Sequence, residues 1–346
     1  MADTFNYRID HQGSLVRPAE LLAARAAGDP EALNAAEVRA VEEAVVLQRR
    51  LRSTVVTDGD FPREDFRSAV LDGVSGFRRT GERDADGLVR WVAESLPKAD
   101  GPLAADRGAR LAELTVIAPK VALPSPAYLA ATTFDPSLAG NGGPASAREL
   151  GEALAEIVQA EIGRLVAAGV RLIQLNNPLL LARLATEPAG GGALSFEDTL
   201  AVEALAVRLD ERPEGVRIAV APGHAAPAAV DRARAERLYG TVAADRWVLP
   251  FDRGTDAELD LVRALPEDRD VCLGVVDPAA AELEDIDTVL DRLDAAGEVK
   301  DLEDAALAPS RGFADVADRP LTDAETQRKK IVLVETLARY VWGNEF

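Results

Sequence analysis

Short apolar runs alternate with longer amphipathic segments along most of the chain. Within the runs, apolar residues follow one another directly, as they do in strands that are buried on both faces of a parallel sheet. In the longer segments they recur every three or four residues, which is typical of helices packed by one face. We therefore predict strands at 8–10, 53–57, 114–117 with 121–123, 170–175, 216–220, 247–249, 271–276 and 305–307, and helices at 36–52, 63–77, 149–166, 199–209, 227–239, 284–293 and 323–342.

This rhythm amounts to roughly eight strand–helix units, which close naturally into a (β/α)8 barrel. We predict an α/β fold in which residues 1–346 form a single TIM-barrel domain with an N-terminal helical segment. Residues 80–112 fit the rhythm poorly and are predicted to form an excursion such as a hairpin. A doubly wound open sheet is the alternative, but the sequence has no G-x-G-x-x-G fingerprint after the first predicted strand.

The charge balance limits the partners of this protein. With 39 Lys and Arg against 59 Asp and Glu, the formal net charge is −20, which argues against binding to nucleic acid or to an anionic membrane. A site for an anion must therefore be a local basic pocket. Cys272 is the single cysteine, so an intrachain disulfide is excluded, and its apolar surroundings predict a small buried side chain.

The start of the chain lacks the basic and apolar regions of a signal peptide. No apolar run approaches the roughly 20 residues that a membrane helix needs. We therefore expect a cytoplasmic protein whose partner is a small molecule, with no nucleic-acid or membrane partner. The sequence leaves a homo-oligomer open.

Polar residues that follow predicted strands are the candidate site, because barrel active sites lie at the C-terminal ends of the strands. Gly13 and Ser14 offer a backbone amide and a hydroxyl to a small carboxylate. Arg17 could pair with the same carboxylate or tether its own loop. Asp58 and Asp60 follow the second strand, where they either contact an amine or cap the next helix.

Two histidines also follow predicted strands. His224 has a side chain that titrates near neutral pH, so its place at a strand end invites general acid–base catalysis, although a structural or solvated histidine is the alternative. His11 has a similar position after the first strand. Asp252 and Asp277 are strand-end carboxylates, whereas Lys120 precedes a strand and is expected at the opposite end of the barrel.

Several stretches resemble the catalytic barrel of cobalamin-independent methionine synthase, namely 10–18, 57–63, 120–126, 173–178 and 309–313. The resemblance implies a barrel fold and an amino-acid pocket to which Ser14 and Arg63 contribute. Asp60 stands where the family has a Glu that takes the substrate ammonium group, which keeps the charge but shortens the reach. Asn176 and Asn177 replace an Asp-Glu pair, and an amide can neither balance an ammonium group nor accept a proton at neutral pH.

The same resemblance points to the loss of a metal. In the family, a His-x-Cys strand, a later Glu and a last Cys hold a zinc that activates homocysteine. The corresponding positions here fall on Ala219, Ala221, Pro250 or its neighbours, and Ser310. Because zinc favours nitrogen and sulfur donors, we expect no metal and no cofactor. A thiol acceptor is then not expected, because zinc is what lowers the thiol pKa.

The sequence leaves three functions open. The first is an enzyme that keeps the pocket and performs metal-free acid–base chemistry on a small amino or carboxylic acid, as a lyase, decarboxylase, isomerase or transferase. The wider superfamily includes the uroporphyrinogen decarboxylase barrel, which also works without a metal. The second is folate-linked methyl transfer to a non-thiol acceptor, and the third is a non-catalytic paralogue that binds a metabolite or a partner protein. The residues predicted to be catalytic are His224, Asp60 and His11, and those predicted to bind substrate are Ser14, Arg17, Asp58, Arg63, Asn176, Asn177, Asp252 and Ser310.

Overall fold

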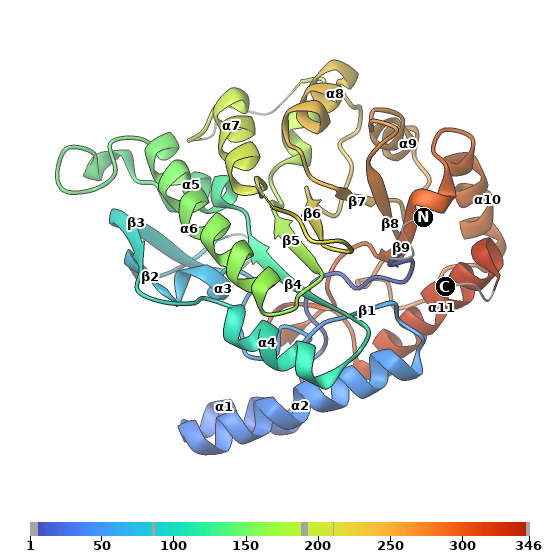
Figure 1. Ribbon diagram of the computed structural model, residues 1–346, viewed down its shortest axis with the longest axis horizontal. Coiled ribbons are helices and arrows are strands. Elements are labelled where there is room, and N and C mark those ends of the chain that lie inside the picture. Colours follow the sequence, from blue (N-terminus) through green and yellow to red (C-terminus); the bar gives the residue numbers. More distant parts are fainter. Residues whose placement is uncertain (1–5, 85–86, 188–192, 210, 344–346) are drawn as a thin grey trace.

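The computed structural model describes residues 6–84, 87–187, 193–209 and 211–343. Its centre is a seven-stranded parallel sheet in the order β1-β4-β5-β6-β7-β8-β9 (Figure 1). Neighbours in this order are also neighbours along the chain apart from the inserted β2–β3 hairpin, as expected for successive βα units. The strands are β1 (Val55–Val56), β4 (Ala118–Pro124), β5 (Leu172–Asn176), β6 (Arg217–Ala221), β7 (Arg246–Pro250), β8 (Asp270–Val276) and β9 (Ala305–Pro309).

The extended segment at residues 8–10 occupies the eighth position of the barrel. On one side, the Asp10 N–H donates to the Leu307 carbonyl at 2.9 Å and the Leu307 N–H donates to the Arg8 carbonyl at 2.8 Å. On the other side, the Thr54 N–H donates to the Ile9 carbonyl at 3.2 Å. The segment thus joins β9 to the residue before β1, and the predicted TIM-barrel fold is confirmed.

Helices lie around the outside of the curled sheet (Figure 1). Most begin at an Asp, Ser or Thr whose side chain accepts a backbone N–H of the first turn, which supplies a partner that the helix itself cannot provide. In the described part of the chain, none of the helices is both long and apolar enough to cross a membrane. The helices are α1 (Ala19–Ala27), α2 (Pro30–Arg50), α3 (Ser68–Leu71), α4 (Ala105–Leu114), α5 (Pro126–Thr133), α6 (Ala147–Ala167), α7 (Phe196–Ala206), α8 (Arg232–Thr241), α9 (Asp256–Arg263), α10 (Ile286–Gly297) and α11 (Ala324–Trp342), with short 3-10 turns at Pro136–Leu138, Leu181–Leu184 and Leu302–Asp304.

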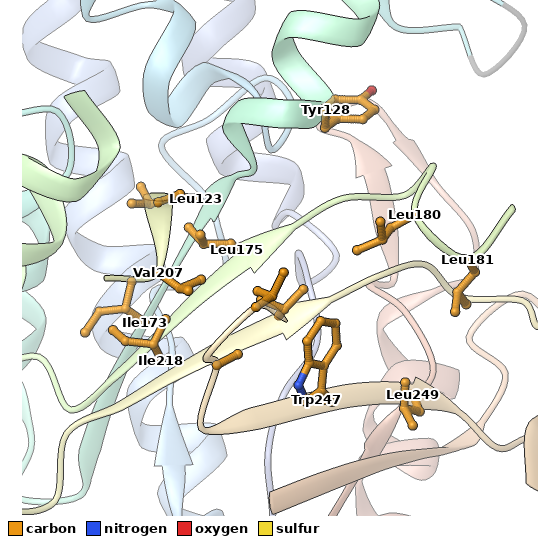
Figure 2. Close-up of a cluster of buried hydrophobic side chains, with 14 of the residues drawn as sticks. Leu123, Tyr128, Ile173, Leu175, Leu180, Leu181, Val207, Ile218, Trp247 and Leu249 are labelled. Atoms are coloured by element: carbon orange, nitrogen blue, oxygen red, sulfur yellow. The ribbon is translucent and has the colours of Figure 1, made fainter. Parts of the chain in front are cut away.

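Alternate residues of the strands pack on opposite faces of the sheet. The outward-facing set packs against the helices, and Figure 2 shows Ile173, Leu175 and Ile218 in this layer. Trp247 belongs to the same layer and meets Tyr239 of α8 edge-on, with the ring centroids 4.6 Å apart. The inward-facing set forms a separate, smaller cluster inside the barrel, made of Tyr7, Val55, Leu172, Ala219, Val248, Cys272, Ala306 and Ala308.

The predicted excursion is an antiparallel hairpin of β2 (Val74–Arg83) and β3 (Val89–Ala99), which projects from the side of the barrel (Figure 1). It begins before residue 80, and α4 occupies the end of the range predicted for it. A small antiparallel ribbon is formed by β10 (Ala314–Val316) and β11 (Arg319–Pro320). Its Arg319 side chain donates to the Gly87 carbonyl at 2.7 Å. This bond fixes the turn of the hairpin over the carboxyl end of the barrel.

The helix predicted at 63–77 is wrong, since only α3 is helical within it. Asp65 accepts the Arg67 backbone N–H at 2.8 Å and pairs with the Arg67 guanidinium at 2.7 Å, which holds the preceding residues in a turn. Gly76 then adopts a φ of +95°, a value incompatible with a helix. Local side-chain bonds therefore override the apolar spacing in this stretch.

The strand predicted at 114–117 is also wrong. The Thr115 hydroxyl accepts the Ile117 N–H at 3.0 Å and forms a tight turn, so β4 starts at Ala118. Val116, which the apolar run suggested as a buried strand residue, is fully exposed at this turn. The chain needs the turn to reverse from α4 into the sheet.

The helix predicted at 227–239 starts later than expected, and three helices, α4, α5 and α9, were not predicted. The Asp231 carboxylate accepts the Arg234 N–H at 3.1 Å, and this cap sets the start of α8. Of these three, α9 has a reciprocal capping box in which Thr255 and Glu258 satisfy each other's backbone N–H groups. The spacing T-x-x-E was therefore a readable signal for its start.

Candidate active site

A cavity of about 410 Å³ opens at the carboxyl ends of the strands. Asn176 ends β5, Ala221 ends β6, and Ser310 follows β9, so three strand ends line it. Leu88 of the hairpin and Tyr128 of α5 line another side and give the cavity an apolar wall. Its position is that of the active site in enzymes with this fold.

His224 and Arg311 meet at this cavity. An Arg311 Nη1 lies 3.1 Å from His224 Nε2, and the other Nη donates to Asp315. Partial burial and the Arg311 charge lower the pKa of His224 below its ordinary value, although Asp315 opposes the shift. The imidazole is therefore neutral at pH 7, with Nε2 as the acceptor toward the guanidinium.

Three charged side chains line the cavity in the described part of the chain. Arg311 is the cation among them, and Asp84 and Asp315 are the carboxylates. Arg311 is half-buried against Asp315, so its charge is already partly balanced. A dianion would meet a net negative wall here, whereas one carboxylate and one ammonium group on the same molecule find opposite partners.

Neutral amides form the inner part of the wall. Gln174 Nε2 donates to Gln12 Oε1 at 2.8 Å and to Asn176 Oδ1 at 2.7 Å. All three residues line the cavity, and Gln174 lies deeper in β5 than Asn176. Reading the alternation along β5 would have identified Gln174, because Leu172, Gln174 and Asn176 share the inward face.

Asp60 and Arg63 are not among the residues that line the cavity. Ser14 does line it, and its hydroxyl donates to Asp60 Oδ2 at 3.1 Å. Arg63 occupies the other Asp60 oxygen at 2.7 Å and also donates to the Ala122 carbonyl at 2.8 Å. Asp60 therefore accepts the Ser14 hydroxyl without lining the cavity itself. Of the three residues predicted to share a pocket, the structure brings His224 to the cavity wall but neither Asp60 nor Arg63.

Arg17 and Asp58 belong to the same buried support. The Arg17 guanidinium donates to the carbonyls of Asp60 at 2.9 Å and Arg63 at 3.1 Å, so it tethers the loop after β1. Burial lowers the pKa of Arg17 to about 10. Asp58 accepts the Asp60 N–H at 2.9 Å, and burial raises the pKa of its carboxyl. Both side chains thus organise the loop.

Asn177 and Asp252 also lie away from the cavity lining. Asn177 donates to Glu203 Oε1 at 2.6 Å, and the Ser125 hydroxyl donates to the same buried carboxyl. Glu203 thereby ties together the ends of β4 and β5. Burial raises the pKa of Asp252, whose carboxyl lies beside the Ser310 hydroxyl.

His11 is buried away from the cavity lining, with Nε2 at 2.7 Å from the Ser53 hydroxyl. Burial lowers its pKa to about 4. We expect the wild-type protein to lose on the order of 3 kcal/mol as the pH falls from 6.5 toward 4, because the unfolded state takes up the proton first. His11→Gln should remove that part of the pH dependence in urea unfolding series; an identical pH slope for both proteins would contradict this assignment.

Lys120 lies inside the barrel. Its ammonium group donates to Asp10 Oδ1 and to the His11 carbonyl, both at 2.7 Å, and it is 2% exposed. Arg246 Nη1 lies 3.7 Å from the second Asp10 oxygen. These charges form a buried network in which the first strand is held against β4 and β7.

The four positions that the resemblance to the methionine synthase family assigns to zinc lie in or near the cavity wall or inside the barrel. Ala221 and Ser310 line the cavity, and Ala219 is fully buried inside the barrel. Within residues 6–84, 87–187, 193–209 and 211–343, no group of three or more His, Cys, Asp and Glu side chains is placed to hold a metal ion. Two alanines and a proline lack side-chain donors, so the donor set here does not fit zinc.

Gly13 lines the cavity, and its backbone passes close to the backbone of Gly312. Its φ is +54°, and a Cβ on it would lie 2.8 Å from the Gly312 Cα. We expect Gly13→Ala to lower the free energy of unfolding by about 3 kcal/mol, from backbone strain together with the clash. Gly28→Ala is the matched control, because its φ of +71° imposes strain without any contact within 4 Å, at about 1 kcal/mol. Equal losses in chemical denaturation would show that the close approach does not matter.

Comparisons with known proteins agree with the barrel fold. The chain is 26% identical to the uncharacterized protein YxjH of Bacillus subtilis (strain 168), over 97% of this chain and 95% of that protein. A provisionally assigned vitamin-B12 independent methionine synthase from Listeria monocytogenes superposes with a TM-score of 0.75 at 22% identity, over 98% of each chain. A B12-independent methionine synthase from Shewanella sp. W3-18-1, solved in complex with selenomethionine, gives a TM-score of 0.76 at 18% identity, over 97% of each chain.

A methyltransferase from Methanosarcina mazei is more distant, with a TM-score of 0.56 at 11% identity over 99% of this chain and 97% of that one. No protein-family model matches the chain. The fold and the cavity therefore define a TIM-barrel protein with the architecture of the B12-independent methionine synthases. The superpositions establish the shared fold. At sequence identities this low, the chemistry has to be argued from the site.

Proposed function

We propose that this protein is a barrel enzyme related to the methionine synthases that acts without zinc on a small amino acid. The observation that carries the proposal is the pairing of His224 with Arg311 at the cavity, where Ala221 and Ser310 stand at two of the positions that the resemblance to the methionine synthase family assigns to zinc. Acid–base chemistry by a histidine is what such a wall can offer. An amino acid fits because the wall carries one cation and two carboxylates.

Arg311 would bind the substrate carboxylate, since a guanidinium offers two parallel donors to it. Asp84, Asp315 and the Ser14 hydroxyl would then be available for the ammonium group. The Shewanella methionine synthase in complex with selenomethionine supports an amino acid as the ligand class for a cavity of this fold. Pairing with a carboxylate also reduces the effect of Arg311 on His224, so the imidazole would become a stronger base in the complex.

We expect protein purified without added metal to contain zinc far below one equivalent. The positions that the resemblance assigns to zinc fall on Ala219, Ala221, Pro250 or its neighbours, and Ser310, and one serine hydroxyl cannot hold the ion. Elemental analysis of the purified chain measures this directly. Stoichiometric zinc that is lost on mutation of Ser310 would contradict the proposal.

Titration calorimetry with a panel of L-amino acids and simple carboxylic acids tests the ligand class. We expect binding of at least one amino acid, and a loss of at least tenfold in affinity in Arg311→Gln because the carboxylate loses its partner. Arg237→Gln is the matched control, since Arg237 lies on the surface of α8 in an exposed pair with Glu197. Failure of every amino acid to bind would refute the amino-acid assignment, and an amino acid that binds without turnover would indicate a binding protein.

A further inference from the structure

The inner end of the cavity carries amide groups that the fold leaves unsatisfied. Gln12 and Gln174 are 5% and 1% exposed, and both line the cavity. Gln12 Nε2 and Gln174 Oε1 have no hydrogen-bond partner in the described part of the chain. Burying a polar group without a hydrogen-bond partner costs free energy of folding, so a ligand that pairs with both groups would recover that cost.

The pair offers one donor and one acceptor, whichever way the two amides are oriented. Gln174 Nε2 donates to Gln12 Oε1, which leaves the Gln12 NH₂ as the donor and the Gln174 oxygen as the acceptor. If the amides of Gln12, Gln174 and Asn176 were all turned over, the bonds between them would reverse and the two free groups would exchange roles. Gln12 also lies beside the Cys272 thiol, but a neutral thiol is only a weak acceptor.

We propose that this inner subsite binds a neutral carboxamide, so that the substrate is an amino acid with an amide side chain, of the glutamine or asparagine type. A carboxamide carries one acceptor and one donor group side by side, which complements the two free atoms. The inference rests on the proposed function, because the α-carboxylate is assigned to Arg311 at the same cavity.

A side-chain carboxylate fits the same place poorly. Its two oxygens are both acceptors, so one would face the Gln174 oxygen. An apolar side chain of the same shape would leave both amides without partners, which sites built for hydrogen bonding reject strongly.

Matched amino acids test the subsite by calorimetry. We expect L-glutamine or L-asparagine to bind at least tenfold more tightly than the corresponding acid and than its apolar isostere, L-methionine or L-leucine. Gln12→Glu keeps the oxygen that accepts from Gln174 and replaces the free donor by a second oxygen. This variant should abolish the preference for the amide, whereas Gln159→Glu on the exposed side of α6 should retain it.

The outcomes separate the two proposals. Tighter binding of methionine or glutamate than of glutamine would overturn the carboxamide subsite and leave the amino-acid assignment standing. Failure of all the amino acids to bind would overturn both. If Gln12→Glu does not fold, as circular dichroism would show, Gln12→Met takes its place, because it removes the free donor and keeps a side chain of similar shape. An unchanged amide preference in the folded variant would overturn the subsite.

Discussion

Replacing His224 by alanine is expected to lower kcat by on the order of 10²–10⁴ for the amino acid that the binding panel identifies. His224 lines the cavity and is neutral at pH 7 because of partial burial and Arg311, and its Nε2 can accept a proton from a bound substrate once Arg311 turns from it to the substrate carboxylate. Because the ring is assigned to proton transfer and Arg311 to binding, KM should change far less than kcat. Steady-state kinetics on the wild type and the variant measures both effects.

The pH dependence distinguishes a base from a merely structural ring. A general base works in its neutral form, so kcat/KM, which reports the free enzyme, should fall as the pH drops through the lowered pKa of His224. Arg311→Gln removes a nearby positive charge, so the pKa should rise and the acidic limb should move to higher pH. Arg237→Gln should leave the limb in place. Full activity of His224→Ala would keep the cavity as the site and reject His224 as the base.

Replacing Lys120 by methionine is expected to lower the free energy of unfolding by about 3–5 kcal/mol. The substitution leaves Asp10 Oδ1 and the His11 carbonyl without the ammonium group that now donates to both. The Arg246 guanidinium at 3.7 Å is too far from Asp10 to replace those hydrogen bonds. Urea unfolding followed by circular dichroism measures the change.

Two further variants show whether the loss comes from an uncompensated buried charge. Lys120→Met with Asp10→Asn removes both charges and should recover part of the stability, because neither partner is then left ionised in the interior. Lys329→Met removes an exposed lysine, 3.7 Å from Glu325, and should change stability by less than about 0.5 kcal/mol. A loss below about 1 kcal/mol in Lys120→Met would show that the buried pair contributes little.

The barrel was predictable because its signal is local. Apolar runs and amphipathic segments fix which residues can be buried in strands and helices, and strict alternation of the two types leaves few topologies. The errors fall where a single side chain redirects the backbone. The Asp65 carboxylate accepts a backbone N–H in the turn that stands where a helix was predicted. The Thr115 hydroxyl does the same in the turn that stands where a strand was predicted. Such bonds are weaker signals than apolar spacing, so periodicity alone missed them.

The candidate site was predictable only in part. Placing polar residues at strand ends found Ser14, Asn176 and His224, and all three line the cavity. The same rule applied after the last strand would have found Arg311, which follows Ser310 directly. This rule could not show that the Asp60 carboxylate pairs with the Arg63 guanidinium, because that pairing depends on how the loop after β1 folds back on itself.

By itself, the sequence determined the class of fold, the end of the barrel where the cavity opens, and the lack of side-chain metal donors at Ala219 and Ala221, because these follow from residue type and position along the chain. The tertiary structure alone decided which polar residues face the cavity and which support it from behind. Lys120 and Asp10 meet across 110 positions of sequence, and Arg311 and His224 across 87. Contacts of this kind are set by the closure of the barrel, which brings distant strand ends together.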